Sequence, residues 1–330
     1  MTRIAVAIVH GIEISDPDFA ATPTRLLRQG FARELGVPVA DTEDMLVVEP
    51  VHWAPYLERR QRELFAKIYP AQTGPSFVDE LSRLIKMINA GGVAALVPFV
   101  ASLLNPFRCG LRSLRYPAAR WMVVHFVGDV IAYDRTAGAT NYTAIHETFA
   151  RGLAALADRA GEDAPLCVIA HSFGSVLASD YVYDRQQSDQ GRALVAPAVA
   201  AAAGPSPLAR GETLGWFYTM GSPLALWSLR YPAAELDRPI AFPGSGLADR
   251  YPGLPGEWVN FYDADDVIAY PMRGLSPAYA RVVTEDRAVS VHGWNPIFAT
   301  PLAHPYYWSD RAVMQRIARS LAAAWTLMDR

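Results

Sequence analysis

The sequence predicts an α/β protein built on a mostly parallel central sheet with helices on both faces. Short apolar runs, rich in β-branched and aromatic residues, alternate with segments whose apolar residues recur at helical spacing. Because several runs are apolar almost throughout, we expect their strands to be buried on both faces, as in parallel sheets. Hydrophobic residues make up 51% of the 330 positions, enough for a large core in a single domain spanning residues 1–330.

Seven apolar runs are the candidate strands. Each is about as long as a typical strand, and Gly, Pro, Asn, Asp or Ser often follows it. In chain order the expected strands are Ile4–Val9, Met45–Val51, Trp121–Val127, Leu166–Ala170, Leu214–Met220, Trp258–Tyr262 and Ala288–Val291.

Two segments carry the clearest helical pattern. The first covers residues 142–160, where apolar residues recur every three or four positions and Thr140 or Asn141 can cap the start. The second covers residues 310–328, with Ser309 as its expected cap. Both helices are long enough to cover a sheet.

Two regions break the alternation. Residues 188–212 are rich in Ala, Pro and Gly and are expected to form a loop, whereas residues 52–118 form an insertion that is either a helical cap or lid, or ordinary core. Within it, residues 90–104 are apolar throughout. They are too short to span a membrane, for which roughly 20 residues are needed, and Pro98 interrupts them. We expect a buried helix or a mobile lid here, with peripheral membrane or lipid contact as a further candidate role.

Charge and cysteine content narrow the function classes. With 30 basic and 33 acidic residues the net charge is −3, so nothing favours nucleic acid as a partner. The two cysteines, Cys109 and Cys167, are far apart, which fits a reducing compartment better than a disulfide framework. The run Ile4–Val9 is too short for a signal-peptide core. A cytoplasmic location is expected.

The most informative local pattern surrounds Ser172. The apolar run Leu166–Ala170 precedes it and a helix-like segment follows, which is how a chain presents a nucleophilic serine on a sharp turn. Such a turn crowds the residues two before and two after the serine, and Ala170 and Gly174 are small enough. The helix start then offers the backbone amide of Phe173 to a developing oxyanion. The alternative is a buried serine at an ordinary turn.

Two segments resemble motifs of the α/β-hydrolase superfamily, in particular its lipase- and esterase-like members. Residues 170–174 (Ala-His-Ser-Phe-Gly) resemble the nucleophile elbow, with alanine for the usual first glycine. Residues 8–12 (Ile-Val-His-Gly-Ile) resemble the oxyanion loop of small lipases. The resemblance implies the α/β-hydrolase fold and makes the amide of Ile12 the second oxyanion donor. It covers residues 4–51 and 121–330 but not the insertion.

The order of the triad in this family is serine, acid, histidine, so the acid is expected after a later strand. Asp266 opens the run Asp-Val-Ile-Ala-Tyr-Pro, which is similar to the Asp-x-Val-Pro segment of lipases. Asp263 and Asp265 are the runners-up, with loop or turn capping as their alternative role. The acid would hold the imidazole in one tautomer and stabilise its charged form.

Two histidines follow the last expected strand. His304 lies in an Ala-His-x-x-Tyr-Trp pattern that resembles the histidine loop of bacterial hydrolases of this kind, and it is preferred as the base. His292 directly follows a strand and is the alternative, with a structural or pocket role as its other interpretation. Ser222 is the rival nucleophile, but it precedes a proline and lacks a following helix like that of Ser172.

Neither metal nor cofactor is expected. No His, Cys, Asp and Glu cluster has metal-ligand spacing. Gly11 stands without the further glycines of a dinucleotide-binding fingerprint.

Three hypotheses about function follow from these patterns. The first is a serine hydrolase that cleaves carboxylic esters, in which Ser172, Asp266 and His304 form the triad and Ile12 and Phe173 the oxyanion hole. Its substrate would be a small, apolar ester. The second is an acyltransferase with the same triad, because the first half-reaction is identical. The third is a non-catalytic ligand-binding member of the fold. The sequence does not indicate the oligomeric state.

Overall fold

The computed structural model describes most of the chain in two compact units. The described residues are 2–11, 16–68, 124, 127–133, 140–230, 239–291 and 301–329. The first unit contains residues 2–11 and 17–53 and the described residues from 143 to 329. The second contains residue 16, residues 54–68 and the described residues between 124 and 142.

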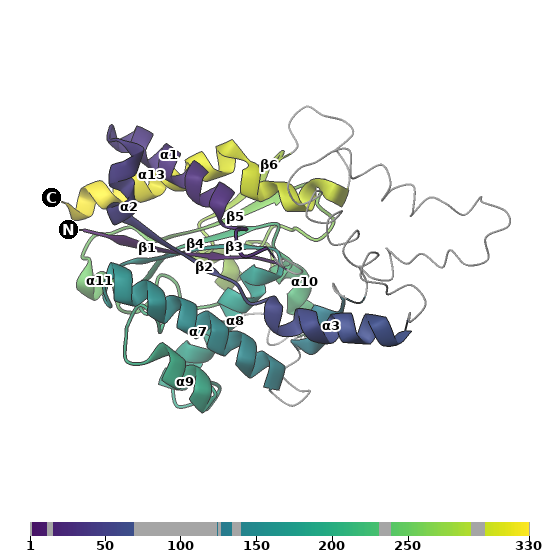
Figure 1. The fold of residues 1–330 in the computed structure, drawn as a ribbon. Helices are drawn as coiled ribbons and strands as arrows, with labels where there is room; N and C mark the ends of the chain where they lie inside the picture. Colours follow the sequence, from purple (N-terminus) through teal and green to yellow (C-terminus); the bar gives the residue numbers. More distant parts are fainter. Residues whose placement is uncertain are drawn as a thin grey trace, which may run out of the picture. The chain divides into compact units, whose positions relative to one another are not determined.

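The first unit is built on a six-stranded sheet in which all neighbouring strands are parallel (Figure 1). The strand order is β2-β1-β3-β4-β5-β6, so the chain starts inside the sheet and reverses direction between β1 and β3. In open parallel sheets such a reversal marks a crevice at the carboxyl ends of the strands. The strands are β1 Ile4–Val9, β2 Leu46–Val51, β3 Leu166–His171, β4 Leu214–Met220, β5 Glu257–Asp263 and β6 Glu285–Val289.

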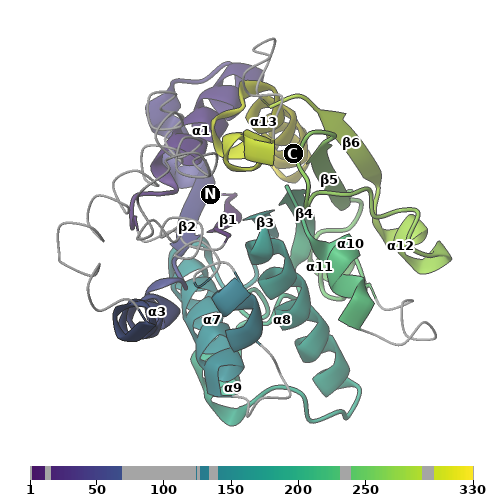
Figure 2. The same cartoon turned by 90° about the vertical axis from the view of Figure 1, so that its right-hand side faces the viewer.

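Helices cover both faces of this sheet (Figures 1 and 2). Helices α1 (Ala21–Leu35) and α13 (Arg311–Met328) pack together on one face, and α8 (Phe173–Asp189) and the body of α7 (Thr140–Ala160) lie on the other. The shorter helical elements of the first unit are η1 Val39–Asp41, α2 Thr42–Met45, α9 Pro197–Ala203, α10 Leu224–Trp227, η3 Ser228–Arg230, α11 Leu247–Arg250, α12 Pro277–Val282 and η5 Pro301–Ser309.

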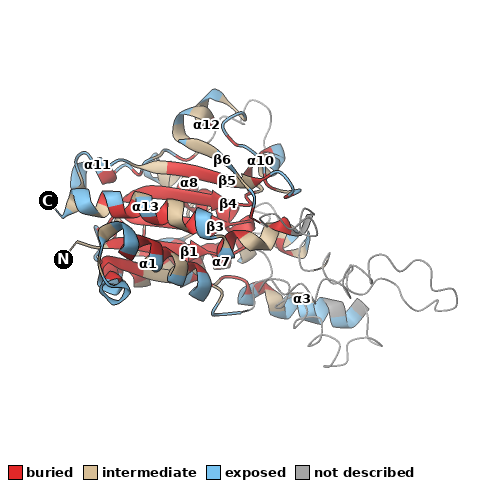
Figure 3. Ribbon diagram, turned by 90° about the horizontal axis from the view of Figure 1, so that it is seen from above, coloured by how far each residue is buried: buried red, intermediate tan, exposed pale blue. Residues whose placement is uncertain are grey.

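The strands of the sheet interior are buried on both faces (Figure 3). On one face, Ile4 and Ile8 of β1 pack in a core cluster with residues of α1 and α13 such as Phe31 and Ile317. The two helices approach closely at Gly30, where a Cβ atom would lie 2.7 Å from the Cβ of Ala318. Burial of this apolar surface is the main stabilising contribution to the unit.

The second unit contains α3 (Pro55–Ile68) and a helical stretch at residues 127–132. The Gln61 side-chain amide donates a hydrogen bond to the buried Asp129. The remainder of the expected insertion, including the candidate lid and lipid-contact segment at residues 90–104, lies outside the described residues. Within the described ranges, no helix is both long and apolar enough to cross a membrane.

The α/β architecture with a parallel sheet is confirmed, and several local predictions are corrected. The expected strand at residues 121–127 is wrong, because residues 124 and 127 are helical. The expected loop at 188–212 contains α9. Asp310 caps α13 in place of Ser309, and its carboxylate accepts the Val313 N–H at 2.8 Å. Helix α1 was not among the expected elements.

Candidate active site

The parallel sheet brings several predicted site residues to one edge. Strands β1, β3, β4 and β5 end at Val9, His171, Met220 and Asp263, and in a parallel sheet these ends share an edge. The segments that follow carry Gly11, Ser172, Gly221 and Asp266. Strand pairing alone therefore gathers residues that are far apart in the sequence.

Ser172 forms a strained turn between β3 and α8. Its backbone has φ 54° and ψ −133°, and it is the one non-glycine residue with positive φ in the described part of the chain. Such a conformation costs roughly 1–3 kcal/mol and persists only where surrounding contacts hold it. The Ser172 N–H donates to the Met220 carbonyl at 2.9 Å, and the Ser172 carbonyl accepts the Ser175 hydroxyl at 2.6 Å. Hydrogen bonds of both the N–H and the carbonyl group of Ser172 therefore stabilise the turn.

Two glycines allow the turn to sit tightly against the end of β1. A Cβ atom on Gly174 would lie 2.3 Å from the His10 carbonyl oxygen, a distance that real structures do not show. A Cβ on Gly11 would lie 2.5 Å from the Ser172 Cβ. The backbone after β1 therefore runs directly against the Ser172 side chain. Ile12, the predicted second oxyanion donor, lies outside the described residues.

His10 is buried and fixes the backbone beside Ser172. Its Nδ1 lies 2.6 Å from the Gly11 carbonyl oxygen, and its Nε2 accepts the Trp53 backbone N–H at 3.1 Å. These bonds fix the neutral tautomer with the proton on Nδ1. Burial lowers the pKa of His10 to about 3, which is consistent with a neutral ring. The predicted motif residue thus orients the loop and carries no charge.

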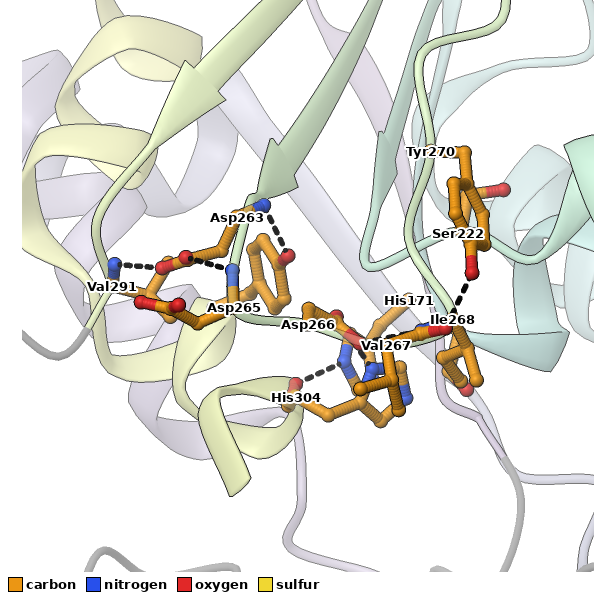
Figure 4. A network of polar contacts seen from close by, with 12 residues as sticks. His171, Ser222, Asp263, Asp265, Asp266, Val267, Ile268, Tyr270, Val291 and His304 are labelled. Atoms are coloured by element: carbon orange, nitrogen blue, oxygen red, sulfur yellow. Dashed lines mark hydrogen bonds and ion pairs between the residues drawn. The ribbon is translucent and has the colours of Figure 1, made fainter. Parts of the chain in front are cut away.

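Asp266 and His304 form a hydrogen-bonded pair (Figure 4). Asp266 follows β5, His304 lies in η5, and His304 Nδ1 is 2.8 Å from Asp266 Oδ2. Burial of Asp266 opposes ionisation, but the bond and charge of His304 and the Ile268 N–H outweigh it, so the carboxyl pKa falls below its usual value. His304 Nε2 is buried and has no hydrogen-bond partner among the described residues, so no bond from Ser172 Oγ reaches it in this structure.

Gly221 places this pair beside the Ser172 turn. It follows Met220, whose carbonyl holds the Ser172 N–H, and has φ 57°. A Cβ atom on Gly221 would lie 3.1 Å from both Asp266 Oδ2 and His304 Cε1. One short stretch of backbone therefore contacts the serine turn on one side and the acid–imidazole pair on the other.

The neighbouring aspartates have other contacts. Asp263 accepts the Asp265 N–H at 3.0 Å through Oδ1 and the Val291 N–H at 2.8 Å through Oδ2 (Figure 4). Asp265 is exposed. Of the three aspartates, Asp266 is the one bonded to His304. His292, the alternative base, lies outside the described residues.

The rival nucleophile Ser222 is buried in a structural contact. Its Oγ lies 2.7 Å from the Ser175 Oγ and accepts the Leu224 N–H at 3.2 Å. Ser175 in turn bonds the Ser172 carbonyl. Ser222 thus supports the turn that presents Ser172.

A buried polar network that the sequence analysis missed fixes the loop carrying Asp266. Asn260, in β5, accepts the Thr219 hydroxyl at 3.0 Å and donates to the Tyr270 carbonyl at 2.9 Å and to Asp286 Oδ1 at 2.8 Å. Asp286 also accepts the Met272 N–H at 2.9 Å. The signal for this network was an asparagine inside an otherwise apolar and aromatic strand, since buried amides require partners.

Comparisons with known proteins leave the family open. A scan against protein-family models, a search of curated proteins and a search of solved structures each found no match. Among the residues that the structure describes, no group of three or more His, Cys, Asp or Glu side chains could hold a metal ion. The chemistry of the site is therefore argued from its own residues.

Proposed function

We propose that this protein is a serine hydrolase that cleaves carboxylic esters through an acyl-enzyme on Ser172. The observation that carries the proposal is the hydrogen-bonded pair of buried Asp266 and partly exposed His304, beside the Gly221 backbone, which directly follows the contact to the Ser172 turn. A serine hydroxyl needs an oriented base to act as a nucleophile, and this arrangement offers one.

In the proposed reaction Ser172 Oγ attacks the ester carbonyl while His304 Nε2 takes its proton. The hydrogen bond from Nδ1 to Asp266 leaves the Nε2 lone pair free for this step and stabilises the imidazolium that results. His304 then protonates the leaving alcohol, and water attacks the acyl-enzyme with His304 again as base. The reaction requires a hydrogen bond between Ser172 and His304 in the enzyme–substrate complex. Catalytic hydrogen bonds of this kind often tighten only when substrate is bound.

Oxyanion stabilisation is assigned to backbone amides. The Phe173 N–H lies at the first position of α8, where the helix dipole favours negative charge. The Ile12 N–H is the second donor by the resemblance of residues 8–12 to an oxyanion loop. Two such donors are worth several kcal/mol in the transition state, about 3 to 4 each.

Aromatic rings near Ser172 favour a substrate with an apolar acyl group. The Phe173 ring lies edge-on to Trp227 at 5.2 Å between centroids, and the Trp53 ring centroid lies 6.1 Å from that of Phe173. Phe173 and Trp53 are buried and Trp227 is partly exposed, so Trp227 is the ring against which apolar substrate surface can replace water and gain binding free energy. An ester with an apolar acyl chain is the substrate class that fits.

The test is a fluorophosphonate probe together with hydrolysis of p-nitrophenyl esters. Wild-type protein should be labelled and should release nitrophenol, and Ser172→Ala should lose both while it keeps its folded circular dichroism spectrum. Ser222→Ala is the matched control, since it removes a nearby buried hydroxyl and should remain labelled. An unlabelled wild-type protein would favour a ligand-binding role, and acyl transfer to an added alcohol in preference to water would make it an acyltransferase.

A further inference from the structure

Two buried nitrogen atoms near His304 have no role in the proposed reaction. His171 Nδ1 and Trp308 Nε1 are both buried, and neither has a hydrogen-bond partner among the residues that the structure describes. The two residues are 5% and 9% exposed. Buried polar atoms are almost always paired, and an unpaired one destabilises the fold, so such atoms at a candidate site call for an explanation.

The protonation state of His171 follows from its other nitrogen. His171 Nε2 lies 2.7 Å from the His304 carbonyl oxygen, which can only accept, so the proton sits on Nε2. Burial, reinforced by the neighbouring His304, lowers the pKa of His171 to about 3, and the ring is neutral. Its Nδ1 is therefore a hydrogen-bond acceptor.

Trp308 supplies the complementary group. Its Nε1–H is a donor only, and its ring lies against His171 with centroids 5.4 Å apart and planes tilted by 58°. An unpaired acceptor and an unpaired donor therefore belong to two rings in contact. A hydroxyl is the smallest group that can donate to one and accept from the other.

The position of this pair indicates which part of an ester it would meet. The His171 ring also lies against the imidazole of His304, with centroids 4.6 Å apart. In the proposed reaction His304 delivers its proton to the leaving alcohol, so groups packed around His304 border the alcohol portion of the substrate. The oxyanion donor Phe173 instead serves the acyl carbonyl.

We propose that His171 Nδ1 and Trp308 Nε1 form a hydroxyl-binding subsite, and that the substrate is an ester of a diol or polyol with a free hydroxyl beside the scissile oxygen. This inference rests on the proposed function. The free hydroxyl donates to His171 and accepts from Trp308, which satisfies both buried atoms. A site built to pair a substrate hydroxyl discriminates strongly against an analogue that lacks it, because the buried groups are then left unpaired.

The test compares two esters of one acid, the 2-hydroxyethyl ester and the n-propyl ester, in which a methyl group replaces the hydroxyl. Wild-type protein should favour the hydroxyethyl ester by about tenfold or more in kcat/KM. The ratio is measured on the same protein sample, so it is independent of the fraction that is folded. A change in ratio is therefore specific to recognition of the hydroxyl.

Two substitutions remove one polar atom each. His171→Gln keeps an amide N–H that can reach the His304 carbonyl but removes the Nδ1 acceptor, and Trp308→Phe keeps an aromatic ring but removes the donor. Each should bring the ratio close to one, mainly through loss of kcat/KM on the hydroxyethyl ester. Phe19→Leu is the matched control, because the Phe19 ring centroid lies 6.4 Å from that of Trp308 and the Phe19 side chain has no polar atom. Its ratio should stay at the wild-type value.

The outcomes separate this inference from the proposed function. Equal kcat/KM for the two esters in wild-type protein would show that the two nitrogens hold only water, and would overturn the subsite. A wild-type preference that survives both substitutions would also overturn it. Absence of turnover with either ester, and with p-nitrophenyl esters, would overturn the proposed function instead.

Discussion

Asp266 Oδ2 lies 2.8 Å from Nδ1 of His304, and the carboxylate side chain is fully buried while the imidazole keeps 20% of its side-chain surface exposed. The acid is therefore shielded from water, whereas the ring that it orients remains partly accessible. Asp266 therefore orients the ring through Nδ1 from a position that water does not reach, and Nε2 of the same ring has no hydrogen-bond partner among the described residues.

Asp266→Asn should abolish most of the activity with little effect on the fold. The amide is nearly the same size and can still accept the Ile268 N–H, but it cannot stabilise an imidazolium and favours the wrong tautomer. We expect kcat for ester hydrolysis to fall by about three to four orders of magnitude. Steady-state kinetics with a p-nitrophenyl ester measures the loss.

Asp263→Asn is the control for that substitution and should show the opposite pattern. Asp263 accepts the N–H groups of Asp265 and Val291, so its loss weakens the loop by about 1–3 kcal/mol and leaves His304 paired. The midpoint of urea unfolding should fall, and kcat per folded molecule should change by less than about tenfold. Equal losses of kcat in both variants would contradict the assignment of Asp266.

The Ser172 turn stores strain that a glycine should release. Ser172→Ala keeps the Cβ atom at φ 54°, whereas Ser172→Gly removes it. Both variants should be inactive, but the glycine variant should unfold with a free energy about 1 kcal/mol higher than that of the alanine variant. Urea titration of the two proteins decides it, and an alanine variant as stable as the glycine variant would show that the turn is unstrained.

The interior strands could be predicted because burial on both faces makes them apolar throughout. Ile4–Val9 and Leu214–Met220 are confirmed to the residue. The error at residues 121–127 has the same origin, since an apolar run of this length does not distinguish a strand from a buried helix. Helix α1 has a weak helical signal in the sequence because Pro23 and Gly30 lower helix propensity, although both residues are buried in the fold.

The Ser172 turn could be predicted from local sequence, but its surroundings could not. Three aspartates lie within four positions, and only the path of the loop decides that Asp266 is the one that bonds His304. The contact from His171 Nε2 to the His304 carbonyl joins residues 133 positions apart. A pattern along the chain carries no information on such a pairing unless the tertiary fold is known.

Gly174→Ala should destabilise the protein through a backbone clash. Its Cβ would lie 2.3 Å from the His10 carbonyl oxygen and 2.8 Å from that of Val9, both main-chain atoms that cannot rotate away. Forced separation of β1 and α8 should cost about 1–3 kcal/mol or more. Gly274→Ala is the matched control, since no atom of the described residues lies within 4 Å of its added Cβ, and it should leave the unfolding free energy unchanged or slightly higher.

Stability should fall as the pH drops below about 6.5, because two histidines are buried in the neutral form. Burial lowers the pKa of both His10 and His171 from 6.5 to about 3. Between these values the unfolded chain binds protons that the folded protein does not, so acid favours unfolding. Between these two pKa values, each histidine should make the free energy of unfolding fall by up to about 1.4 kcal/mol for each pH unit of acidification. Above the higher value it should make no contribution to the slope.

Urea unfolding at a series of pH values between about 5 and 7 measures that slope. His10→Gln and His171→Gln each remove one of the two buried imidazoles, so each variant should lose stability less steeply with acid than wild-type protein does. The His10 variant should start from a lower stability at neutral pH, because the His10 ring also forms hydrogen bonds with the backbone of Gly11 and Trp53. Slopes that match wild type in both variants would contradict the neutral, buried state of these rings, whereas a change in only one would assign the acid sensitivity to that histidine.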